Sequence, residues 1–226
     1  PPFEEEINME FELRPWLEEF IRRVTAAFPG RVVCIGLQGS RGRGEAGPDS
    51  DIDMAVVLDR LDMADVERYR QTVEALPRRE LLCGFLSGRG ELERWEPGDL
   101  FQFYYDTAPV LGDLEFLRGK FSPGDVERAV RKGVCDLYHG CVHNQIYERD
   151  GALLAGLYKG AVFTLQAKLW LETGEFVKKH RDLLERLAGE DRAVLTRALA
   201  LKEGEMPDLE QDSDLLFHWA GESIRG

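Results

Sequence analysis

Two aspartates at the start of an apolar run constrain the fold of this chain more than any other feature. Asp51 and Asp53 open the run Asp51–Leu58, which follows the glycine-rich segment Gln38–Ser50 and, before that, the β-branched run Arg31–Leu37. The density of glycine in the middle segment predicts a loop between two strands. Because residues two apart on a strand share one face, both carboxylates should leave the same side of a sheet.

Two carboxylates this close repel each other unless a cation lies between them, so the pair indicates a cation-binding site. Mg²⁺, or Mn²⁺ in its place, takes oxygen ligands and is commonly shared between carboxylates and phosphates. Gly39 lets the backbone approach an anion closely, and Ser40 offers a hydroxyl and an amide. Arg41 and Arg43 add cationic donors. The sequence therefore predicts a divalent metal on the two aspartates, opposite a triphosphate held at the glycine–serine pair.

The rest of the first half alternates helices and strands. Apolar residues recur at helical spacing over Phe11–Phe28 and over Met63–Leu76. Strands are expected at Glu80–Leu86 and Leu100–Tyr105, with a short helical turn at Glu91–Trp95 between them. This order predicts a mixed α/β layer.

From Ser122 onward, every signal is helical. Ser122 and Pro123 form a typical helix start, with a serine cap and proline at the first helical position. Helices are expected at Asp125–Tyr147, Ala152–Glu172, Val177–Leu187, Asp191–Leu201 and Leu209–Ile224. Their short connections predict an up-and-down bundle. We therefore expect an α+β protein with a mixed-sheet domain at residues 1–120 and an all-α bundle at 121–226.

Charge and composition narrow the range of partners. The net charge of −13 disfavours nucleic acid as a partner, since its backbone is anionic, and suits a cationic small molecule. Four cysteines in 226 residues do not make a disulfide framework, which favours a reducing compartment. The start Pro1–Glu6 has no apolar region of a signal peptide, and no run is apolar enough to span a bilayer. A cytoplasmic location is expected.

The Gly39-Ser40 pair after one apolar strand, with Asp51-x-Asp53 opening the next, resembles the signature of the DNA-polymerase-β-like nucleotidyltransferase superfamily. Within it, the chain is similar to aminoglycoside adenylyltransferases that carry a helical C-terminal domain of the HEPN or KNTase type. The segment Glu91–Phe103 resembles a tryptophan-containing segment of the streptomycin- and spectinomycin-modifying branch. The segment Leu165–Phe176 looks like the helix that closes over the nucleotide there.

This resemblance assigns further residues to the site. It implies that Ser40 and Ser50 touch the phosphates, and that Lys179 reaches them from the helical domain. It also implies a third carboxylate, which ligates metal or takes the proton from the attacking hydroxyl. The middle of the predicted strand at 80–86 carries no acid, so the candidates are Glu80 at its edge and Asp106 at the end of the next predicted strand. A turn cap is an equally weighted alternative role for Asp106.

The predicted function is metal-dependent transfer of a nucleoside monophosphate to a hydroxyl, with ATP or another nucleoside triphosphate as co-substrate. Three acceptor classes stay open. They are a cationic, aminoglycoside-like antibiotic, which would make the protein a resistance factor; a protein side chain, which would make it a protein AMPylator; and another metabolite. The absence of a mid-strand acid supports an alternative, a non-catalytic nucleotide-binding or toxin–antitoxin interaction module.

Overall fold

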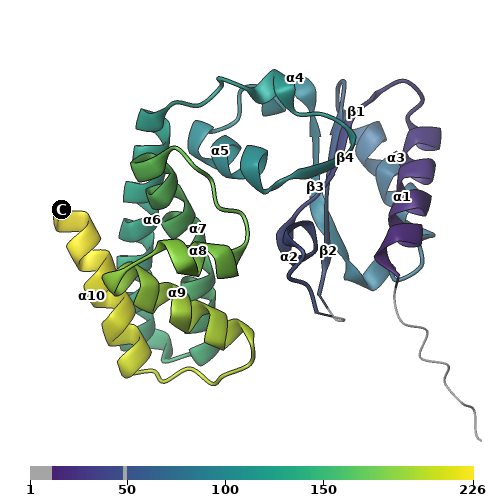
Figure 1. Cartoon of the computed structure of the whole chain (residues 1–226). Helices are drawn as coiled ribbons and strands as arrows, with labels where there is room; N and C mark the ends of the chain where they lie inside the picture. Colours follow the sequence, from purple (N-terminus) through teal and green to yellow (C-terminus); the bar gives the residue numbers. More distant parts are fainter. Residues whose placement is uncertain (1–11, 48–49) are drawn as a thin grey trace, which may run out of the picture. The chain divides into compact units, whose positions relative to one another are not determined.

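A four-stranded mixed sheet is built from the first half of the chain (Figure 1). The computed structural model describes residues 12–47 and 50–226, so the expectations for Phe11 and for the signal-peptide region lie outside the described residues. The strands are β1 (Val32–Leu37), β2 (Ile52–Leu58), β3 (Leu82–Gly88) and β4 (Ala108–Gly112), in the spatial order β3-β2-β1-β4. Strand β1 is antiparallel to β2 and β4, whereas β2 and β3 are parallel.

One face of this sheet is covered by two helices, α1 (Leu13–Ala27) and α3 (Met63–Glu74) (Figure 1). Met54 and Val56 of β2 pack with Phe20 and Val24 of α1 in one buried cluster. Asp53 lies between Ile52 and Met54, which are both in this cluster, so the alternation of side chains along a strand points Asp53 to the opposite face. The apolar core of the sheet therefore fixes which way the aspartate faces.

The order of elements after β3 corrects one sequence prediction. The expected strand at Leu100–Tyr105 is wrong, since these residues belong to helix α5 (Pro97–Asp106). Phe101 and Tyr105, four residues apart and hence on one side of the helix, both enter an aromatic cluster in which Tyr105 stacks on Phe176 with ring centroids 4.7 Å apart. The fourth strand is instead β4, a stretch for which the sequence analysis expected no element.

Two compact units make up the described chain. The sheet unit contains the residues up to Glu93 together with Thr107–Phe116, and the helical unit contains Arg94–Asp106 and Leu117–Gly226. Helix α5 thus belongs to the helical unit although it lies in sequence between β3 and β4. Short elements complete the sheet unit and its connection, namely α2 (Gly39–Arg43), η1 (Arg79–Leu81), α4 (Arg89–Leu92) and η2 (Glu115–Leu117). The predicted domain boundary at residues 120 and 121 stays a prediction.

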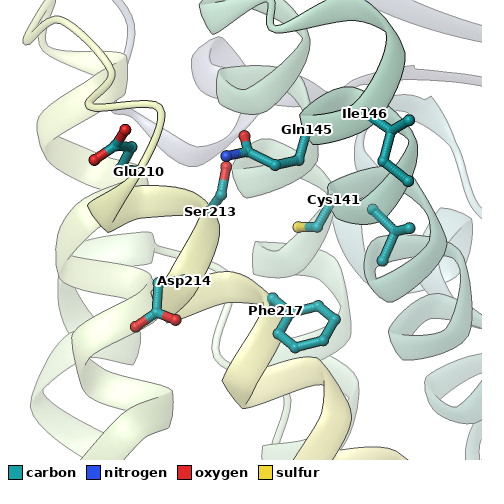
Figure 2. A pocket seen from close by; sticks show the side chains of 8 residues that line it. Cys141, Gln145, Ile146, Glu210, Ser213, Asp214 and Phe217 are labelled. Carbon is teal, nitrogen blue, oxygen red and sulfur yellow. The ribbon is translucent and has the colours of Figure 1, made fainter.

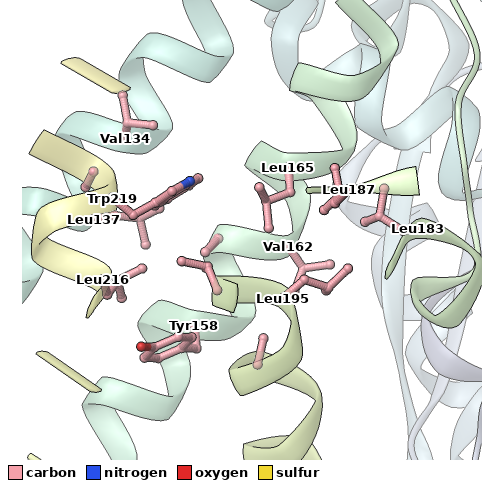
Figure 3. Close-up of a cluster of buried hydrophobic side chains, with 14 of the residues drawn as sticks. Val134, Leu137, Tyr158, Val162, Leu165, Leu183, Leu187, Leu195, Leu216 and Trp219 are labelled. Atoms are coloured by element: carbon pink, nitrogen blue, oxygen red, sulfur yellow. The ribbon is translucent and has the colours of Figure 1, made fainter. Parts of the chain in front are cut away.

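The helical unit confirms the expected helices within a few residues at each end. They are α6 (Pro123–His143), α7 (Gly151–Thr173), α8 (His180–Arg186), α9 (Gly189–Lys202) and α10 (Gln211–Arg225), with a π-helical turn, η3 (Asn144–Glu148), after α6. Side chains such as Leu137, Leu165, Leu216 and Trp219 form its buried core (Figure 3). The α+β fold class is confirmed. None of the helices described here is long and apolar enough to cross a membrane.

A partly buried ion pair joins Arg31, the residue before β1, to the start of α3. Asp62 and Asp65 form a capping box at the N-terminus of α3, and the Arg31 guanidinium donates to both carboxylate oxygens of Asp65, at 2.7 and 2.8 Å. Arg31 also donates to Asp59 at 2.9 Å. The hydrogen bonds from Arg31 lower the pKa of Asp65 to about 2, and Asp65 is only 4% exposed.

This pair predicts an acid dependence of stability. The pKa of Asp65 is lower in the folded than in the unfolded chain, so its contribution to the free energy of unfolding is full above about pH 5 and is lost as the pH falls toward 2. Asp65→Asn should lower the urea midpoint at pH 7, and its difference from the wild type should shrink between pH 5 and pH 2. Asp182→Asn, at an exposed position of α8, is the matched control. A difference that stays constant over this pH range would contradict the prediction.

Candidate functional site

The carboxylate of Asp53 lies against the backbone of Gly39. Gly39 has a φ of +64°, and a Cβ built on it would collide with Oδ2 of Asp53 and lie 2.9 Å from its Cγ. The amide of Gln38 donates to the Asp53 carbonyl at 2.8 Å, which fixes the start of α2 to strand β2. The structure thus brings together the aspartate and the glycine–serine turn, with the Asp53 side chain half-buried between them.

The turn itself is the five-residue helix α2, which lies within the segment predicted as a loop. Its end is set by Gly44, whose left-handed backbone (φ 71°, ψ 30°) follows the pattern of a glycine helix cap, with its amide donating back to Arg41 and Ser40. At the other end, Gly39 opens the helix against the Asp53 carboxylate, and Ser40 follows it. The predicted contact of Gly39 and Ser40 with a triphosphate stays a prediction.

The two arginines of the turn hold the loop together. The Arg41 guanidinium donates to the carbonyl of Ser50, at 2.8 and 3.1 Å, and to that of Asp51 at 3.2 Å. Arg43 is 9% exposed and lies 3.4 Å from the Glu45 carboxylate. Both side chains therefore have protein partners that position the loop, and their predicted role as phosphate donors stays a prediction.

Ser50 and Asp51 are the last two residues before β2. The Ser50 Oγ accepts from the Gly47 amide at 2.9 Å, and the Ser50 amide donates to the Gly47 carbonyl at 3.2 Å. Asp51 is exposed and directly precedes β2. Its carbonyl, held by Arg41, keeps the backbone before Asp53 in place. The predicted roles of Ser50 in phosphate binding and of Asp51 in metal binding remain predictions.

Neither candidate for the third carboxylate lies beside Asp53 on the neighbouring strand. In the parallel pair of β2 and β3, the residue in register with Asp53 is Cys83, which is exposed. Side chains in register on adjacent strands share a face. Glu80 precedes β3, is 67% exposed and pairs with Arg78 at 2.9 Å. Asp106 is the last residue of α5 and is 9% exposed, which makes it the end of a helix and not of a strand.

Two further residues matter for the site. Thr107, 6% exposed, accepts a hydrogen bond from the Gln38 side chain at 2.7 Å and so ties the end of β1 to the start of β4. No signal in the sequence identified it, since β4 itself was not expected. Cys83 could have been found by counting the register from Asp53. Lys179 directly precedes α8 in the helical unit, and its predicted contact with the phosphates stays a prediction.

The donor set fits a metal that is shared with a ligand. Among residues 12–47 and 50–226, no three His, Cys, Asp or Glu side chains are grouped so that they could hold a metal ion. Mg²⁺ is ordinarily bound by one or two carboxylates together with substrate phosphates, and retains several waters. Asp53, which lies against Gly39 at the start of α2, and Asp51, two residues before it, are carboxylates of the type that this mode of binding uses.

Part of the chain matches a family of known proteins. Residues 17–94 match the family described as nucleotidyltransferase domain, a range that includes β1, α2, β2 and β3. Among solved structures, the chain is similar to the spectinomycin adenyltransferase AAD(9) from Enterococcus faecialis, solved with ATP and spectinomycin. The match has a TM-score of 0.63 and 16% sequence identity, and covers 95% of this chain and 100% of that one. No curated protein sequence matches the chain.

The contact between Gly39 and Asp53 predicts a difference between two glycines. Gly30 and Gly39 have similar φ values, +70° and +64°, but a Cβ on Gly30 would meet nothing within 4 Å. Gly30→Ala should therefore cost only the left-handed strain of about 1–2 kcal/mol. Gly39→Ala should cost about 1–3 kcal/mol more, because the methyl group displaces the Asp53 carboxylate. Urea unfolding measures both free energies.

A double variant isolates the contact. Combining Gly39→Ala with Asp53→Ala removes the colliding carboxylate. The loss in the free energy of unfolding of the double variant should therefore be smaller than the sum of the two single losses, by about 1 kcal/mol or more. Equal costs for the two glycine substitutions, or additive effects in the double variant, would contradict the geometry described above.

Proposed function

We propose, on the premise that residues 17–94 are a nucleotidyltransferase domain, that this chain transfers AMP from ATP to a hydroxyl group of a small molecule. The observation that carries the proposal is the packing of the Asp53 carboxylate against Gly39 at the start of α2. A metal on Asp51 and Asp53 would then lie next to a triphosphate bound at the turn formed by Gly39 and Ser40.

The proposed reaction is a nucleotidyl transfer. The acceptor oxygen attacks the α-phosphorus, the bond from that phosphorus to the bridging oxygen of the β-phosphate breaks, pyrophosphate leaves, and the hydroxyl proton passes to a base. A divalent cation bound at the aspartates supplies charge neutralisation on the phosphates. The chain itself supplies positioning: Gly39 leaves room for the Asp53 carboxylate, and Arg41 fixes the backbone at Ser50 and Asp51.

Charge and fold together support a cationic acceptor. The chain carries a net charge of −13, which attracts organic cations and repels polyanions. The similar spectinomycin adenyltransferase was solved with ATP and spectinomycin. An aminoglycoside-like amine with free hydroxyls is therefore the first acceptor class to test, and modification of such an antibiotic would give resistance. A protein side chain is the second class, detected as a mass increase of one AMP on a partner protein.

The identity of the general base separates the proposed transfer activity from the alternative, a non-catalytic module. Cys83 lies where a carboxylate on β3 would be beside Asp53. This observation favours a second candidate function, a non-catalytic module that binds nucleotide without turning it over. Asp106 stays a candidate base from the helical unit.

The first experiment measures metal-dependent nucleotide binding. Wild-type protein should bind α,β-methylene-ATP in calorimetry with Mg²⁺ or Mn²⁺, and lose that binding in EDTA. Asp53→Asn should weaken the affinity at least about 10-fold, by analogy with the loss of groups that support metal ligands. Glu74→Gln, on the exposed side of α3, is the control for the lost charge. Binding that is independent of metal and unchanged in Asp53→Asn would refute the proposal.

The second experiment tests the position of Cys83. Pyrophosphate release is followed with Mg·ATP and a panel of aminoglycosides and aminocyclitols. Cys83→Asp places a carboxylate beside Asp53 and should raise the transfer rate at least about 10-fold, since a positioned general base contributes about 10²- to 10⁴-fold. Cys83→Ser, which adds no carboxylate, should leave the rate unchanged. An active wild type whose rate does not rise in Cys83→Asp would show that another residue is the base.

A further inference from the structure

A separate pocket of about 340 Å³ is built entirely from the helical unit (Figure 2). Its walls come from the end of α6, the π-helical turn η3 and the first half of α10. Ile146 and Phe217 provide apolar surface, and Cys141 adds a buried thiol whose pKa is raised by burial to about 11, so that it stays neutral. This volume lies within the range of pockets that bind small molecules.

The π-helical turn shapes one wall. Asn144, fully buried, donates from its side-chain amide to the Asp150 carbonyl at 3.0 Å and accepts from the Asp150 amide at 2.9 Å. The Arg149 amide donates to the Asn144 carbonyl, five residues back, at 2.7 Å. Wide turns of this kind occur frequently at functional sites. Here the turn points Gln145 toward α10 (Figure 2), and Ile146 is 62% exposed beside it.

The opposite wall is fixed by bonds on the far side of α10. Asp212 accepts two hydrogen bonds from the Arg197 guanidinium, at 2.7 and 2.9 Å, and its carbonyl accepts from the Tyr158 hydroxyl at 2.8 Å. These hydrogen bonds position the first turn of α10, and none of them involves Ser213, the residue after Asp212. Both walls of the pocket are thus held by hydrogen bonds within the protein, and such preorganisation lowers the entropic cost of binding.

Two polar atoms in this pocket lack partners. In the described chain, Ser213 Oγ and Gln145 Oε1 are buried and have no hydrogen-bond partner. Ser213 is 7% exposed, and Figure 2 shows its hydroxyl and the Gln145 amide pointing toward one another. A buried polar atom without a partner destabilises a protein, so its presence in the wall of a pocket points to a ligand.

The rim of the pocket is acidic. Glu210 and Asp214 both line it, and their spacing of four residues places them on the same side of the start of α10. The polar groups that face the ligand are thus two carboxylates, an amide oxygen and a hydroxyl, all of which accept hydrogen bonds. A ligand that matches them carries several donors and a positive charge.

We propose that this pocket binds a small organic cation that joins an apolar ring or chain to a primary ammonium group. The ammonium lies between Asp214, Glu210 and the pair Ser213 and Gln145, and the apolar part packs on the side chains of the pocket wall. The site uses only residues of the helical unit and does not depend on the proposed nucleotide chemistry.

The test uses phenethylammonium as the probe, with 2-phenylethanol as its neutral analogue and 3-phenylpropionate as its anionic one. Binding to the full-length chain is followed by saturation-transfer NMR and by shifts in ¹⁵N spectra. The ammonium should bind saturably and at least about 10-fold more tightly than either analogue, since a charge-assisted hydrogen bond contributes enough free energy for such a factor. Equal binding of the three compounds, or no saturable binding, would overturn the proposal.

Variants of the rim and of Ser213 test whether the probe binds in this pocket. Glu210→Gln combined with Asp214→Asn should reduce the affinity at least about 10-fold, whereas Asp182→Asn combined with Glu185→Gln, which removes the same charge from exposed positions of α8, should not. Ser213→Ala should weaken binding while the melting temperature without ligand stays equal or rises, because a buried hydroxyl without a partner is removed. A rim variant that binds as tightly as the control, or a Ser213→Ala variant that lowers stability and leaves binding unchanged, would refute the assignment.

Discussion

The close packing of Asp53 on Gly39 is the constraint on which the candidate active site depends. A side chain on residue 39 and the carboxylate of residue 53 cannot occupy the same space. Residue 39 is therefore glycine for two reasons: its φ is positive, and the Asp53 carboxylate fills the place of a Cβ. The apolar residues on either side of Asp53 are buried under α1 and α3, and this burial directs its side chain to the other face. The hydrophobic core of the sheet thus orients a polar group that it does not contact.

Arg41 and Arg43 illustrate how the loop is stabilised. Sequence reasoning assigned them to a ligand because cationic residues beside a glycine-rich turn often bind anions. In the structure, Arg41 bonds the carbonyls at the end of the loop, and Arg43 is buried near Glu45. A loop of this length has few backbone partners of its own, so the arginines supply them. The bonds from Arg41 position the backbone that leads into Asp53.

The sequence predicted β1, β2, β3 and the helices of the bundle because each has a long apolar pattern with caps or glycines at its ends. The prediction from the sequence was wrong for residues 97–112, which form α5 and β4. Leu100–Tyr105 is apolar or aromatic except for Gln102, and a short run of this kind fits a strand as well as a helix. Tertiary packing decides between them: a Cβ on Gly98 would lie 2.6 Å from that of Ala129, so α5 approaches α6 closely. Strand β4, which is short and largely exposed, has no apolar alternation to reveal it.

For the same reason, the part of the site that could be predicted is the part that is local in sequence. Gly39, Ser40 and Asp53 are connected by a short loop between adjacent strands, so their meeting follows from the spacing. Cys83 and Thr107 reach the same region through strand register and through β4, which depend on contacts distant in sequence. The pocket beside α10 is less predictable still, because its defining feature is polar atoms that lack partners, and only a structure can show what a side chain does not bond. Sites built from local motifs can therefore be read from one sequence, whereas sites defined by unsatisfied groups cannot.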